Sequence, residues 1–455
     1  MRPRAPHALL AAATALAAAL MAPQPAAAAV PASGTYYVQS AAPGLNAADS
    51  RGAVEQHRPR GDEDRQQWRL KPDGSASLLE NTDAPGSCLG RSGDQAATVA
   101  CASADAAWEI TASGTDLFTL RVPGTTRHLT VAPKPPGANH PARLVLGGPG
   151  DLAAWYLTPV EPATAPLPPQ DRRTLDQVTF LTTHNAYANG VDGGFAPPFV
   201  NLVPNQTRGI ERQLADGVRG FMLDVHQTPD GAILCHNSCT LVSRPVALWV
   251  DLQRIVDFLE AHPDQFVTVF LEDHVDPGVL RAELARVDGL PDVLYRPDRT
   301  GVRQYGWPAM AELIAANDRL LLFTDHSRSA DQAAGLTRDG FGVMYQREWT
   351  VENYWSMGAG VGTSDWSCYS RWYGPDVNIP LTRTEPGFRP LFVMNHFRDV
   401  PFTGTATTDN SKLADRARRF CQPAARKKPT FLAVDHYDRG DPAAAAAALN
   451  AYTYP

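Results

Sequence analysis

Five residues whose side chains can move protons or bind a cation follow short apolar runs in the middle of the chain. His184 and Asn185 follow the first run, Asp224 and then His236 follow the second, and Glu272 ends the third. Buried parallel strands read as apolar runs, and in α/β proteins the chemical groups gather where strands end. Two imidazoles beside three oxygen donors therefore predict acid–base chemistry on an anion that a hard cation holds. The segments are FLTTHNAY (180–187), GVRGFMLDVHQTPDGAILCHNSC (217–239) and VTVFLEDHV (267–275).

Asp224 is the member of this set that most needs a partner. Alternate side chains of a strand share a face, which puts Met222, Asp224 and His226 together and directs Arg219 away. A carboxylate at the end of a central strand is costly without a compensating charge, which favours a metal ion or a cation beside it. The alternative is that Asp224 caps a turn or pairs with Arg219. For each histidine the alternative is a buried, hydrogen-bonded structural role.

Residues 171–455 alternate strand-like and helix-like patterns. The clearest helix is 247–261, where Trp249, Leu252, Val256 and Leu259 recur at three- and four-residue steps. Such alternation over this length predicts an α/β barrel of the TIM type. An open doubly wound sheet is the alternative, but no Gly-rich strand-to-helix turn supports it. The other expected elements are strands 178–182, 218–225, 267–271, 320–323, 342–345, 391–394 and 431–434 and helices 277–287, 307–316, 411–420 and 442–452.

The N-terminus, residues 1–29, predicts a secretory signal peptide. Arg2 and Arg4 precede the apolar run 8–21, and small residues follow it. A membrane anchor, the alternative, would need about 20 apolar residues. A secreted, extracellular protein would hold its six cysteines as disulfides, and no close CxxC pair or ligand cluster suggests zinc. Spacing alone does not fix the pairing, but local order favours Cys88–Cys101 and Cys235–Cys239, which leaves Cys368–Cys421.

Residues 30–160 predict a small all-β domain, because short apolar segments alternate with turn residues. Trp68, Trp108 and Trp155 recur at intervals of 40 and 47 residues, which indicates repeated units around one core. Three units that close on Trp resemble the ricin-type β-trefoil, whose Gln-x-Trp signature is intact only at residues 66–68. In that family a sugar-binding Asp often follows Cys-Leu, whereas this chain has Gly90. Core packing is the preferred role of the tryptophans, and residues 161–170 predict a Pro-rich linker.

The central segments, taken in order, resemble the X region of phosphatidylinositol-specific phospholipase C and of secreted proteins that contain this domain. The likeness rests on THNAY, GVRGFMLD, LCHN, FLEDH and VMNHF. It implies that His184 and His236 are catalytic. His236 would be the general acid for the departing diacylglycerol oxygen, and His184 would stabilise the phosphate and move protons. An inositol 2-hydroxyl would attack the phosphorus.

The resemblance also implies a calcium site. Metal-dependent members of the family have Asn after the first His, Asp on the second strand and Glu in the third segment, which correspond to Asn185, Asp224 and Glu272. A Glu expected two residues before the Asp is replaced by Met222, and a thioether suits calcium poorly. The sequence therefore predicts weak use of Ca²⁺. Asp435, after the last strand, would orient His184.

Several alternatives stay open on sequence grounds. The expected partners are a phospholipid or other phosphodiester, met at a membrane surface, and a carbohydrate held by residues 30–160. A net charge of −7 gives no basic surface for nucleic acid. A carbohydrate-binding protein with a silent barrel is one rival function, and a glycerophosphodiesterase or sphingomyelin-type phosphodiesterase is another. Arg219 would pair with a buried carboxylate or be structural, while Trp366, Trp372 and Tyr373 would flank the cleft or pack in the core.

Overall fold

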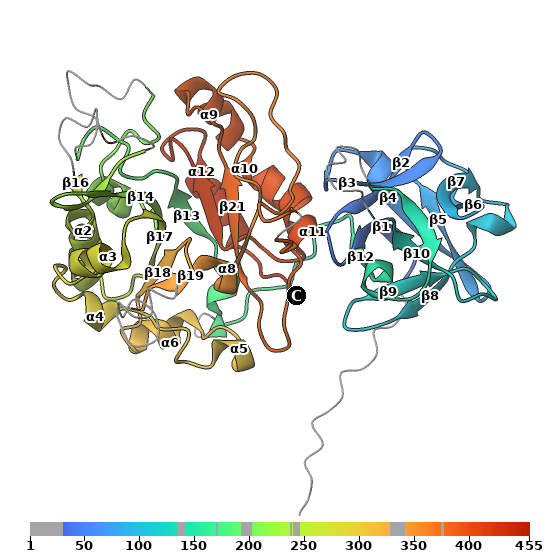
Figure 1. Ribbon diagram of the computed structural model, residues 1–455, viewed down its shortest axis with the longest axis horizontal. Helices are drawn as coiled ribbons and strands as arrows, with labels where there is room; N and C mark the ends of the chain where they lie inside the picture. Colours follow the sequence, from blue (N-terminus) through green and yellow to red (C-terminus); the bar gives the residue numbers. More distant parts are fainter. Residues whose placement is uncertain are drawn as a thin grey trace, which may run out of the picture.

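The structure is a computed structural model in which two bodies lie side by side (Figure 1). One, drawn in blue to teal, consists of strands and short 3-10 helices and is called here the N-terminal region. The other, drawn in green to red, combines strands and helices and is called the C-terminal region. The predicted signal peptide (1–29) lies outside the described residues, as does residue 170 of the predicted linker. The structure describes residues 31–133, 142–169, 172–192, 203–236, 239, 246–327, 342–374 and 377–455.

The N-terminal region is all-β, as predicted, and its strands form one antiparallel sheet in which β1 pairs with β2, β4 and β12. The three repeated tryptophans are fully buried, which confirms their role in the core. Each indole nitrogen donates to a backbone carbonyl: Trp68 to Ala47, Trp108 to Leu89 and Trp155 to Leu129, at 3.0, 2.8 and 2.9 Å. The elements are β1 (Gly34–Ser40), β2 (Asn46–Ser50), β3 (Ala53–His57), η1 (Asp64–Gln66), β4 (Gln67–Asp73), β5 (Ala76–Asn81), β6 (Ser87–Ser92), β7 (Gln95–Ala100), η2 (Ala104–Ala106), β8 (Glu109–Ala112), β9 (Phe118–Arg121), β10 (His128–Val131), β11 (Leu144–Gly147), η3 (Asp151–Ala153) and β12 (Trp155–Pro159).

The C-terminal region is built on a parallel sheet in the order β19-β18-β17-β14-β13-β22-β21-β20. A short antiparallel extension, β15 and β16, continues from β14. The strands are β13 (Phe180–Thr183), β14 (Gly220–Thr228), β15 (Gly231–Leu234), β16 (Val246–Ala247), β17 (Val267–His274), β18 (Leu320–Thr324), β19 (Met344–Tyr345), β20 (Thr350–Glu352), β21 (Leu391–His396) and β22 (Phe431–Val434).

The predicted architecture, a small trefoil-like domain in front of a closed TIM-type barrel, is wrong, because the parallel sheet is open. In the part of the chain that the structure describes, no pairing joins its edge strands β19 and β20. These strands have two and three residues, and the helical turn α8 (Gln346–Trp349) lies between them. Closure requires ladder hydrogen bonds between the two edges, and such short strands offer few donors and acceptors for it.

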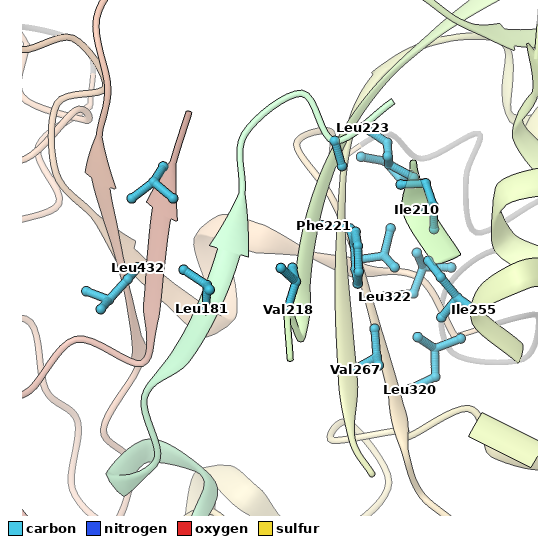
Figure 2. Packing of buried hydrophobic residues seen from close by; sticks show 14 of the residues in the cluster. Leu181, Ile210, Val218, Phe221, Leu223, Ile255, Val267, Leu320, Leu322 and Leu432 are labelled. Carbon is cyan, nitrogen blue, oxygen red and sulfur yellow. The ribbon is translucent and has the colours of Figure 1, made fainter. Parts of the chain in front are cut away.

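Alternation along the parallel strands divides the apolar residues between two faces of the sheet. Leu181, Phe221 and Leu322 belong to the core that also contains Ile255 of helix α2 (Leu248–Ala261) (Figure 2). Phe180, Phe270 and Phe323 belong to a second, aromatic core on the other face. Met222 packs against this second core, so Asp224, two residues further along β14, faces the same side.

Helices follow most of the strands, and the predicted helix 247–261 corresponds to α2. In the described residues no helix is both long and apolar enough to span a membrane. All three predicted disulfides, Cys88–Cys101, Cys235–Cys239 and Cys368–Cys421, are present. The remaining elements are η5 (Leu175–Gln177), α1 (Ile210–Ala215), α2 (Leu248–Ala261), α3 (Pro277–Leu284), α4 (Leu290–Val293), α5 (Val302–Tyr305), α6 (Met310–Ala315), α9 (Thr403–Asn410), α10 (Leu413–Asp415), the π-helical η7 (Arg416–Cys421), α11 (Gln422–Ala425) and α12 (Pro442–Leu449).

Candidate active site

A cavity of about 680 Å³ at the carboxyl ends of the parallel strands brings all five predicted site residues together. His184 and Asn185 follow β13, Asp224 lies on β14, Glu272 lies on β17, and His236 follows β15. Asp224 and Glu272 are direct neighbours in the β14–β17 ladder, so their carboxylates share one face. Segments far apart in the sequence thus form a single polar pocket.

His184 is held by contacts on two sides. Its Nδ1 lies 2.9 Å from Oδ1 of Asp435, which follows β22, and Asn205 Nδ2 donates to the same oxygen at 2.8 Å. The imidazole stacks on Phe397 with 3.7 Å between ring centroids and 4° between planes. A carboxylate on Nδ1 fixes the tautomer, so Nε2 is left to exchange protons with a ligand. The predicted contact between Asp435 and His184 is therefore present, whereas no sequence pattern pointed to Asn205.

His236 lies in the loop that the Cys235–Cys239 disulfide closes. Although much of the residue is exposed, partial desolvation of its imidazole lowers the pKa of His236, and repulsion from His184 adds to this effect. Glu272 and Asp435 act in the opposite direction. His184 and Asp435 both affect the pKa of His236, as expected if the imidazoles of His184 and His236 face the same cavity.

The three predicted metal ligands present oxygen donors to the same pocket. Asn185 is 1% exposed, has a left-handed backbone (φ 45°), and its Oδ1 has no hydrogen-bond partner among the described residues. Burial, followed by the charge of Glu272, raises the pKa of Asp224 to about 7. Glu272 is exposed and contacts His274 at 3.0 Å. An orphaned amide oxygen and a carboxylate destabilised by a like charge fit a hard cation such as Ca²⁺.

Met222 lines this cavity as well, at the position where the resemblance expects a carboxylate. Its side chain is half-buried and packs against the aromatic core under the pocket. The site therefore lacks one hard ligand that the resemblance implies, and the thioether makes this part of the floor apolar.

The cavity is also lined by a hydrogen-bonded network that sequence reasoning missed. The carboxylate of Glu352, 2% exposed, accepts hydrogen bonds from Gln346 Nε2 (2.9 Å), Arg371 (2.8 Å) and Asn395 Nδ2 (2.7 Å). All four residues line the cavity. Arg371 is partly exposed and its pKa is raised, chiefly by Glu352, so it presents a permanent cation. Glu352 ends a strand, which is the one signal that could have pointed to it.

The other residues that the sequence singled out have structural partners instead of a place among the catalytic groups. Arg219 pairs with no buried carboxylate in the described residues; it donates to Gln265 Oε1 and to backbone carbonyls and lies over Phe258. His396 is a structural histidine, since burial lowers its pKa to about 3 and its Nε2 contacts the Asp409 carbonyl. Trp366, Trp372 and Tyr373 do not line this cavity. Trp372 is buried and Trp366 packs against the main core, so for these two the core-packing alternative is confirmed.

The expectation that no zinc-type cluster exists needs a correction. The structure places a nitrogen of His226 within 4.8 Å of the sulfurs of Cys235 and Cys239. Because those two sulfurs form a disulfide, they have no thiolate to offer a metal. The ladder between β14 and β15 brings these groups together, which the spacing in the sequence does not reveal.

Comparison with known proteins finds similarity over the C-terminal region. Residues 172–356 match the PI-PLC X family model, PI-PLC X 1. A PI-PLC X domain-containing protein of Arabidopsis thaliana is 28% identical over 287 residues, covering 61% of this chain and 62% of the relative. An uncharacterized secreted protein of Arthroderma benhamiae is 24% identical over 293 residues, covering 62% of each. The chain thus spans less than two thirds of the length of these two relatives.

Among solved structures, the Macrolepiota procera ricin B-like lectin in complex with lactose is 21% identical. The likeness covers 29% of this chain and 98% of the lectin, with a TM-score of 0.24. A score this low supports no statement about sugar binding. Similarity to a phospholipase-type X domain is therefore the finding that bears on function.

Proposed function

We propose that the protein is a secreted phosphodiesterase of the phospholipase C type that cleaves phosphatidylinositol or a closely related phosphodiester. One observation carries the proposal. Two imidazoles from different strand ends, His184 and His236, line one cavity, and a carboxylate fixes the tautomer of His184. Similarity to proteins named for the X domain supports the same class of reaction.

In the proposed reaction a hydroxyl of the substrate headgroup attacks the phosphorus and loses its proton to Nε2 of His184. The bond from phosphorus to the diacylglycerol oxygen breaks, and His236 protonates that oxygen as it leaves. A lowered pKa suits His236 to this role, because a weaker base gives up its proton more readily. Once it has taken up the hydroxyl proton, His184, held by Asp435, donates from Nε2 to a phosphoryl oxygen and returns the proton in the later hydrolysis.

Asn185, Asp224 and Glu272 would hold a calcium ion. When bound, such an ion supplies positive charge to the phosphoryl oxygens. The orphaned Asn185 oxygen and the raised pKa of Asp224 support this choice of ligands. Because Met222 occupies the position of a further carboxylate, affinity for the ion is expected to be weak.

Cleavage of phosphatidylinositol vesicles by the full-length protein tests the function. His236→Ala and His184→Ala are each expected to reduce turnover by about 10²-fold or more. His262→Ala, at the exposed end of α2 and outside the cavity, is the matched control and should retain full activity. Equal activity of His236→Ala and the control would refute the catalytic assignment, and full activity with excess chelator would refute the calcium assignment alone.

Carbohydrate binding is a second candidate function, favoured by a cavity of about 640 Å³ between the two regions. Arg60 and Glu63 from the N-terminal region and Asp365 and Tyr369 from the C-terminal region contribute to its lining. The guanidinium of Arg60 is paired with nearby carboxylates, so the pocket better suits a neutral, hydroxyl-rich ligand than an anion. Calorimetry of the full-length protein with a panel of hexasaccharides tests this, and Tyr373→Ala, a change in the same lining, should weaken any binding.

A further inference from the structure

We infer that residues 58–60 of the N-terminal region position one wall of the candidate active site, with Arg58 as the principal positioning residue. The inference rests on the proposed function, because it concerns the same cavity. It goes beyond that function in assigning the N-terminal region a role in catalysis that does not depend on a ligand of its own. A chain of contacts leads from Arg58 to the cavity.

The first contacts join the N-terminal region to the segment 365–369. The Arg58 guanidinium lies 3.9 Å above the centre of the Tyr369 ring and 3.5 Å from Asp365. The Pro59 carbonyl accepts a hydrogen bond from the Cys368 amide at 3.0 Å, and Arg60 lies 3.7 Å from Asp365. These contacts hold the segment from one side, and the Cys368–Cys421 disulfide ties it to η7.

The next contacts join that segment to the cavity wall. Asn353 and Ser370 form an antiparallel bridge, the Tyr354 amide donates to the Tyr369 carbonyl (2.8 Å), and the Arg371 amide donates to the Glu352 carbonyl (3.0 Å). The Tyr369 ring stacks on Tyr354 at 5.2 Å and 13°. The two backbone stretches therefore move together.

The last contacts reach the cavity itself. Tyr354 stacks on Trp355 with 5.7 Å between ring centroids, and Trp355, Glu352 and Arg371 all line the pocket. Arg371 is the cation of this wall, and its side chain bonds to Glu352 of the paired stretch. A shift of residues 365–369 would consequently displace the cation and the aromatic ring that face a bound substrate. Arg58 contacts Tyr369 and Asp365 and acts on Arg371 and Trp355 only through this segment.

The test compares two full-length variants that each remove one arginine from the contact between the regions. Arg58→Ala removes the guanidinium over Tyr369. Arg426→Ala is the matched control, because Arg426 contacts Thr158, Asp116 and Tyr156 of the N-terminal region and lines neither cavity. Hydrogen–deuterium exchange of peptides covering 352–355 and 366–371 provides a readout that does not need activity, and KM and kcat on phosphatidylinositol vesicles provide the second.

Arg58→Ala should speed amide exchange in both peptides. It should raise KM by roughly threefold to tenfold, a size in keeping with the loss of a partly exposed cation–π contact. The kcat should stay within about twofold of the wild type. Arg58→Lys, which keeps a cation over the ring, should restore most of the difference, and Arg426→Ala should leave both readouts unchanged. Equal behaviour of the two alanine variants, or unchanged exchange in Arg58→Ala, would overturn the inference. If the wild type cleaves no phosphodiester, the proposed function fails, and the exchange result still decides whether Arg58 positions the wall.

Discussion

Replacing Asp224 by Asn tests the charge balance of the cavity. The side chain is buried next to Glu272, and its pKa rises from 3.8 to about 7. The unfolded chain gives up this proton near pH 4, whereas the folded chain keeps it to about pH 7. Wherever the folded state binds more protons, stability falls as the pH rises. The wild type should therefore lose stability between about pH 4 and pH 7, by at most ~4 kcal/mol from this residue, at about 1.4 kcal/mol per tenfold change.

Asp224→Asn removes this penalty, because the amide stays neutral at every pH. In the presence of chelator the variant should unfold at higher urea concentration than the wild type at pH 8, and the two should differ little at pH 4. Urea titrations of the full-length protein, followed by tryptophan fluorescence, measure the difference. A variant whose midpoint falls with pH as steeply as that of the wild type would refute the argument from burial.

Calcium adds a second arm to the same experiment. At pH 8 the ion should stabilise the wild type, because it compensates the charge of Asp224, and should stabilise Asp224→Asn much less. Asp251→Asn is the matched control: Asp251 is fully buried, burial also raises its pKa to about 7, and it does not line the cavity. It should alter the pH dependence but keep the response to calcium. Equal stabilisation of wild type and Asp224→Asn would refute the metal assignment.

Two further predictions concern the histidine and the rim of the cavity. Asp435→Asn removes the carboxylate on His184 Nδ1 and should lower kcat on phosphatidylinositol by about 10²-fold. The circular dichroism spectrum should stay unchanged. A loss of kcat below about threefold would contradict the role of Asp435. Phe402→Ser combined with Val361→Ser removes side chains that are 42% and 67% exposed beside the cavity-lining Val400 and Pro401. This change should weaken sedimentation with phosphatidylinositol vesicles, whereas Tyr305→Ser, at a distant exposed site, should not; equal binding by both would argue against a membrane-facing rim.

Much of the candidate site could be predicted from the sequence because its residues follow apolar strands. Strand ends of a parallel sheet meet at one edge, so His184, Asp224 and Glu272 could be expected together. Asp435 could be assigned by the same reasoning. Arg371 and Asn205 could not, because they lie in irregular segments whose course depends on packing. For Arg219 the sequence left a buried carboxylate partner and a structural role both open, and the observed partners are Gln265 and backbone carbonyls.

The sequence by itself determined the strand ends and the donor types of the pocket, because these depend on local pattern and residue chemistry; for the disulfides it only favoured the pairs that the structure contains. Only the tertiary structure decided whether the parallel sheet closes, since closure depends on hydrogen bonds between β19 and β20 rather than on either strand alone. It also decided how the N-terminal region contributes: Arg58 and Tyr369, far apart in the chain, meet through side-chain packing that no periodicity records.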